Sequence, residues 1–74
     1  MTRLPSDISG AALRRALERA GFVFQRQKGS HMVLRRDSPF ARVVVPNHRT
    51  LRPGTLRAIL HDAGLSVDDL LKFL

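Results

Sequence analysis

Three short segments with the character of β-strands lie close together in the middle of this chain. Residues 22–27, 31–36 and 42–45 either alternate polar with apolar side chains or are rich in β-branched and aromatic ones. The stretches between them, 28–30 and 37–41, contain the glycine, serine, aspartate and proline typical of turns. Connections this short cannot hold a crossover helix, so neighbouring strands must run antiparallel. The sequence therefore predicts a three-stranded antiparallel meander.

Segments with helical periodicity flank these strands. The first follows Ser9, which can cap a helix, and ends at Gly21, where a left-handed stop is expected. The second begins at Pro53, which suits a first helical turn, and ends at Gly64. A short last helix is predicted after Ser66, which is followed by two acidic residues in the first turn. The apolar residues at helical spacing in the two long segments are Ala12, Leu13, Ala16, Leu17, Ala20, Leu56, Ile59, Leu60 and Ala63.

The order of these elements predicts an α+β fold of the form α-β-β-β-α with a short extra C-terminal helix. In the second strand Met32 and Leu34 share one face, which we expect the helices to cover. His31 and Arg35 then look outward from the other face. We expect residues 1–74 to form a single domain with a small core, because a chain of this size buries only about 60% of its unfolded surface.

The charge of the chain limits the classes of partner. Lys and Arg number 13 against 6 Asp and Glu, which gives a net charge of +7 and a pI of about 11.8. A balance this basic favours an anionic polymer as partner. The sequence has no cysteine, which excludes disulfides and thiolate zinc sites, and its carboxylates are too scattered for a convincing metal site. It also lacks a long apolar run and the apolar core of a secretory signal, so we expect a cytoplasmic protein without a membrane partner.

A group of residues that could take part in proton transfer and anion binding lies at the start of the second predicted strand. Gly29, Ser30 and His31 combine a flexible backbone, a hydroxyl and an imidazole, with the cations Arg26 and Lys28 just upstream. A histidine side chain has an ordinary pKa of about 6.5, so it can exchange a proton near neutral pH. The neighbouring cations would hold an anionic substrate against it. From composition alone, however, a histidine in a strand is more often structural than catalytic.

The loop after the third strand holds a second cationic group. His48 could transfer a second proton or bind phosphate, although a histidine after proline more often serves a turn. Arg49 and Arg52 follow it and could bind phosphates, or they could simply keep the protein soluble. His61, on the flank of the second long helix, is predicted to have no role. The RNA-binding residues predicted from both groups are Arg26, Lys28, Gly29, Ser30, His48, Arg49 and Arg52.

Five segments, taken together and in order, resemble the motifs of a known family, the HicA toxins. They are Gly21-Phe22, Lys28-Gly29-Ser30-His31, Val45-Pro46-Asn47-His48, Gly54-Thr55-Leu56-Arg57-Ala58-Ile59-Leu60 and Ala63-Gly64-Leu65. The resemblance extends over about residues 9–70. It implies a fold like that of double-stranded-RNA-binding domains and membership of a toxin-antitoxin pair. It further implies ribosome-independent cleavage of mRNA, a HicB antitoxin as partner, and His31 as the catalytic histidine.

This chemistry needs no cofactor. The ribose 2′-OH of RNA is itself the nucleophile, so a base for its proton and an acid for the leaving 5′-oxygen are sufficient. With four phenylalanines and no tyrosine or tryptophan, stacking of single-stranded bases is disfavoured relative to phosphate and 2′-OH contacts. The first hypothesis is therefore a metal-independent endoribonuclease toxin. The alternatives are a non-catalytic RNA-binding module of the same fold and a small regulatory protein that docks an acidic protein.

Overall fold

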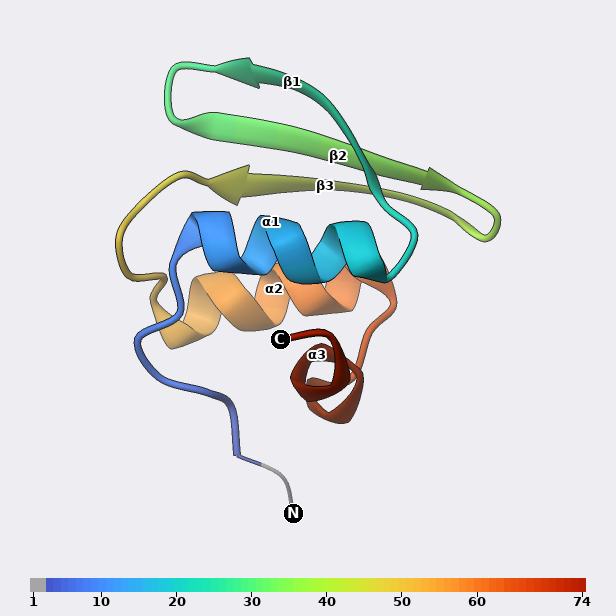
Figure 1. The fold of residues 1–74 in the computed structure, drawn as a ribbon. Coiled ribbons are helices and arrows are strands. Elements are labelled where there is room, and N and C mark those ends of the chain that lie inside the picture. Colours follow the sequence, from blue (N-terminus) through green and yellow to red (C-terminus); the bar gives the residue numbers. More distant parts are fainter. Residues whose placement is uncertain (1–2) are drawn as a thin grey trace.

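The computed structural model describes residues 3–74 and confirms the predicted α+β fold. Its elements occur in the order α-β-β-β-α-α (Figure 1). They are α1 (Gly10–Arg19), β1 (Val23–Lys28), β2 (His31–Asp37), β3 (Phe40–Pro46), α2 (Pro53–Ala63) and α3 (Val67–Phe73).

The sheet has β2 in its centre, with β1 and β3 paired antiparallel on either side. A bulge interrupts the register of β1 between Phe24 and Arg26. The strand β3 begins at Phe40, two residues earlier than the sequence pattern predicts. The reason is that the turn closes over only two residues, so Asp37 and Phe40 still pair across the ladder.

The helices cover one face of the sheet, and the core lies between these two layers (Figure 1). As predicted, Met32 and Leu34 are buried on this face. Each buried aliphatic side chain of this kind stabilises the fold by roughly 1.5–3 kcal/mol relative to an exposed one. The other large side chains buried in this core are Ile8, Leu13, Leu17, Phe22, Val43, Val45, Leu51, Leu56, Ile59, Leu60 and Leu70.

Helix termini follow the capping signals in the sequence. The hydroxyl of Ser9 accepts a hydrogen bond from the Ala12 N–H at 3.0 Å, and Gly64 ends α2 in the left-handed conformation with φ 72°. Gly21 also has a positive φ, 99°, where α1 gives way to β1. Among residues 3–74 no helix is long and apolar enough to cross a membrane.

The opposite face of the sheet is open. His31 and Arg35 are exposed there, as predicted, whereas Val33 between them is only 7% exposed, with Arg26 and Val44 as its register partners. Figure 1 shows that α1 and α2 both begin at the end of the molecule that carries the β1–β2 turn. The β2–β3 turn and the ends of both helices lie at the other end.

Candidate nucleic-acid interface

The β1–β2 turn presents His31 at the edge of the molecule. Lys28 and His31 are the last paired residues of the two strands, and only Gly29 and Ser30 separate them. Gly29 has a φ of 58°, a conformation that costs glycine little and other residues more. The side-chain Nε2 of Gln27 donates a hydrogen bond of 2.9 Å to the Gly29 carbonyl. The turn therefore closes over two residues and is held by a side-chain hydrogen bond, while the side chains of Lys28, Ser30 and His31 are exposed.

The segment that leaves β3 lies against this turn. His31 pairs with Pro46, and one residue further the Asn47 N–H donates to the Ser30 carbonyl at 2.6 Å. The ladder between β2 and β3 is thus extended past the last regular pair. It brings the backbone of residues 46–48 next to the glycine turn.

The start of α1 holds the same segment from the other side. The Gly10 N–H donates to the His48 carbonyl at 2.9 Å, and the Leu51 N–H donates to the Ile8 carbonyl at 2.8 Å. Three segments far apart in the sequence therefore meet at one end of the molecule, which is the left end in Figure 1.

All predicted site residues are exposed, but they do not form one compact cluster. Lys28 pairs with His31 on one side of β2, and on the other side His31 pairs with Pro46, two residues before His48. Arg26 is displaced along the open face, where it pairs with Val33, and Arg52 is the N-cap of α2. His61 lies apart from them on α2, 91% exposed and 3.7 Å from the Asp62 carboxylate.

This end of the molecule carries uncompensated positive charge. Within residues 3–74, no ion pair neutralises the cations Arg26, Lys28, Arg49 or Arg52. Neither α1 nor α2 has an acidic residue in its first turn, so the positive ends of both helix dipoles add to the cationic charge. An anion that approaches His31 would be attracted by all of these groups.

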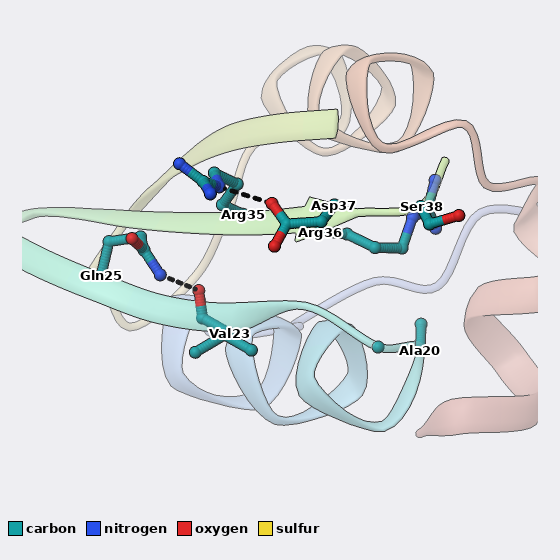
Figure 2. Close-up of a pocket in the computed structure, with 8 residues that line it drawn as sticks. Ala20, Val23, Gln25, Arg35, Arg36, Asp37 and Ser38 are labelled. Atoms are coloured by element: carbon teal, nitrogen blue, oxygen red, sulfur yellow. Dashed lines mark hydrogen bonds and ion pairs between the residues drawn. The ribbon is translucent and has the colours of Figure 1, made fainter. Parts of the chain in front are cut away.

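The two ends of the sheet also differ in the residues that line their surface hollows. Figure 2 shows a pocket at the far end of β2, where Arg35 Nε donates to Asp37 Oδ1 at 2.7 Å and the cation is therefore paired. A second hollow lies beside the candidate site and is lined by His48, Arg52 and the start of α2. His31 is exposed and lines neither of these two hollows.

Two further observations concern residues outside the predicted set. Among residues 3–74 no group of three or more His, Cys, Asp or Glu side chains could hold a metal ion. Gly10, Gln27 and Asn47 form the hydrogen bonds given above around the β1–β2 turn and residues 46–48, and the sequence analysis assigned none of them a role. The signal for Gly10 was its place after the helix cap, and the signal for Asn47 was its place between proline and histidine in one of the segments that resemble the family.

Comparison with known proteins supports the resemblance seen in the sequence. A family described as the HicA toxin of bacterial toxin-antitoxin systems matches residues 10–65. The match runs from the first residue of α1 past the end of α2 and includes every predicted site residue. No curated protein matches the chain.

Proposed function

Because this chain belongs to the HicA toxin family, and is therefore the toxin of a toxin-antitoxin pair, we propose that it cleaves mRNA with His31 as a general acid or base. The observation that carries the proposal is the exposed His31 opposite Lys28, at an end of the molecule whose cations Arg26, Lys28, Arg49 and Arg52 form no ion pair within residues 3–74. Cleavage of mRNA places its action in the cytoplasm.

The proposed reaction is an internal transfer at one phosphodiester. The ribose 2′-oxygen forms a bond to the adjacent phosphorus as the bond from phosphorus to the 5′-oxygen breaks. One proton leaves the 2′-OH and another joins the leaving 5′-oxygen, and His31 performs one of these transfers. Atoms and charge balance without a metal ion, so none is required by this mechanism.

Substrate binding in this proposal rests on phosphate and 2′-OH contacts. Lys28 and Arg49 are the cations nearest in sequence to the two histidines, while Arg26 and Arg52 extend the charged surface along the sheet and to α2. Phe22 is buried and Phe24 and Phe73 pack partly into the core, whereas Phe40 is 67% exposed at the β2–β3 turn, the opposite end of the sheet from His31. Stacking of RNA bases on aromatic rings therefore has little support at the His31 end. Binding of this kind is strong for any RNA and weakens steeply with salt.

The family implies a HicB antitoxin as partner, and we propose that it covers the end of the molecule that carries His31. A surface with unpaired cations is best covered by acidic groups, which would also compete with RNA. We expect the association rate of toxin and antitoxin to rise as salt is lowered, measured by stopped-flow fluorescence. A salt-independent rate, or a complex that still cleaves RNA, would contradict this.

The decisive experiment compares His31→Ala with the unchanged protein on RNA in excess EDTA. A positioned acid or base contributes typically 10²- to 10⁴-fold in rate. We expect the variant to lose cleavage by about this factor while its melting temperature and RNA affinity stay close to those of the unchanged protein. His61→Ala is the matched control, because the side chain of this histidine is 91% exposed on α2 and distant in sequence from the turn.

The outcomes separate the competing hypotheses. Cleavage by the unchanged protein in EDTA that His31→Ala abolishes supports the toxin nuclease. RNA binding with no cleavage by either protein supports a non-catalytic RNA-binding module. A His31→Ala variant that keeps full activity excludes His31 as the catalytic group, and one that unfolds makes it a structural residue.

A further inference from the structure

Gly10 packs against the backbone of the segment that carries His48. A Cβ atom built on Gly10 would overlap the carbonyl oxygen of Pro46 and lie 3.0 Å from the Cα of Asn47. Both neighbours are backbone atoms, which cannot turn aside as a flexible side chain can. Any residue other than glycine at this position must therefore move α1 and residues 46–48 apart.

The same glycine also bonds to this segment. Its N–H donates to the His48 carbonyl, and the Asn47 N–H donates in turn to the Ser30 carbonyl. A continuous series of backbone contacts thus leads from the first residue of α1, through residues 46–48, to the residue before His31. The start of α1, the end of β3 and the β1–β2 turn lie together at one end of Figure 1.

We propose that Gly10 is a positioning residue that holds His48 and the Ser30–His31 turn in their working arrangement. This inference rests on the proposed RNA cleavage. It reverses the usual expectation for a glycine in a helix, which alanine normally replaces with a gain in stability. Here the absence of a side chain is what allows α1 to approach the site. Gly10 itself does not touch the substrate.

The test is Gly10→Ala, with Gly54→Ala as the matched control. Gly54 is also at the start of a helix, but a Cβ there would meet no atom within 4 Å. A displacement of about 1 Å costs roughly 10²-fold at a catalytic site. We therefore expect Gly10→Ala to lower kcat on RNA by about 10²-fold with a smaller change in KM, and Gly54→Ala to leave both unchanged.

A second measurement does not depend on catalysis. Hydrogen exchange of the Asn47 amide reports its bond to Ser30, and we expect this exchange to be faster in Gly10→Ala and unchanged in Gly54→Ala. If His31→Ala proves active, the proposed chemistry fails while the exchange result still supports the positioning role. A Gly10→Ala protein with unchanged kcat and unchanged Asn47 exchange overturns the inference.

A third variant covers the case in which Gly10→Ala does not fold. Chemical synthesis can replace Gly10 by glycolic acid, which converts the amide N–H into an ester oxygen and adds no side chain. This removes the hydrogen bond to the His48 carbonyl and leaves the close packing possible. We expect kcat to fall at least tenfold in this folded protein. An unchanged kcat would show that Gly10 serves packing alone.

Discussion

The two ends of β2 use positive charge in opposite ways. At the far end Arg36 is bound to its surroundings: its Nε donates to the Pro39 carbonyl at 2.9 Å and its Nη2 to the Ala63 carbonyl at 3.1 Å. Its guanidinium carbon also lies 4.7 Å from the centre of the Phe22 ring. One side chain therefore joins the β2–β3 turn, the last residue of α2 and Phe22, the residue before β1.

At the near end the charge is left available. Lys28 faces His31 across the turn, and no carboxylate in residues 3–74 pairs with it. The helix dipoles differ between the two ends in the same way. Arg36 binds at the negative end of α2, whereas the positive ends of α1 and α2 both lie at the His31 end (Figure 1). The cation that stabilises the fold, Arg36, is therefore not one of the cations that we propose to bind RNA.

The largest expected effect on stability follows from Arg36→Met. The variant keeps an apolar stem but loses two hydrogen bonds and the contact with Phe22. Because the bond to Pro39 is exposed and the bond to Ala63 only partly buried, together these contacts contribute about 2 kcal/mol. For a domain of this size that corresponds to a fall in Tm of roughly 8–16 °C. Thermal melts followed by circular dichroism measure it, and RNA cleavage per folded molecule should stay unchanged.

Arg35→Met is the control for this experiment. Arg35 is adjacent in sequence, but its ion pair with Asp37 is exposed and such pairs contribute about 0–1 kcal/mol. Equal losses of Tm in the two variants would show that Arg36 contributes only charge. If folded Arg36→Met loses RNA cleavage, Arg36 serves function as well as stability, and the two ends do not divide these roles between them.

The sequence predicted the far end less well than the near end. Alternation places Arg36 on the same face of β2 as Met32 and Leu34. In the sequence, Arg36 is therefore only a charged residue on a face that is expected to be apolar. Its partner at Ala63 lies 27 residues away, and only the position at which α2 ends over the sheet brings them together. The sequence pattern carries no signal for such a long-range contact.

The near end was predictable because its signals are local. Glycine and serine before His31 indicate a turn, and the strand period places His31 and Arg35 on the open face, where the structure has them. Local signals did not predict that Asn47 would bond to Ser30 or that Gly10 would pack on Pro46, because both depend on register and helix docking. The exposure of His31 and Arg35 was thus predicted from the sequence, and the backbone contacts around the turn were not.

A smaller effect is expected when the free cations are removed. Lys28→Ala with Arg49→Ala should weaken binding of unrelated RNA sequences to a similar degree and reduce the salt slope by about two units, one for each lost phosphate contact. Filter binding at several salt concentrations measures the slope. Stability should hardly change, because neither side chain forms an ion pair within residues 3–74.

The control removes two cations that already have partners in the protein. Arg19 donates to the Phe73 carbonyl at 2.6 Å and Arg35 pairs with Asp37. The pair Arg19→Ala and Arg35→Ala changes the net charge by the same amount, so any difference between the two double variants reflects position. If both reduce the salt slope equally, RNA responds to net charge alone and the near end has no special role.

The smallest expected effect concerns pH and α3, which is fastened to the end of α1 by the bond from Arg19 to Phe73. Asp69 and Ser66 form a reciprocal cap: the Asp69 N–H donates to the Ser66 hydroxyl at 3.0 Å, and the Ser66 N–H donates to the Asp69 carboxylate at 2.9 Å. The hydrogen bond from the Ser66 backbone, with a second from its side chain, lowers the pKa of Asp69 below its ordinary value of 3.8. The ionised carboxylate is therefore favoured in the folded protein.

A lowered folded pKa fixes the sign of the pH dependence. The contribution of the Asp69 charge is fully present above about pH 3.8 and is lost as the pH falls through the lower folded value. Asp69→Asn keeps an acceptor oxygen but no charge, so it should be slightly less stable than the unchanged protein at pH 7, and the difference should close below pH 3.8. Hydrogen exchange read by NMR at both pH values measures it, with the Leu70 amide responding and the Asn47 amide unaffected. A response at Asn47 as well would mean that acid loosens the whole fold, and that the cap on α3 is not separate from the end that carries His31.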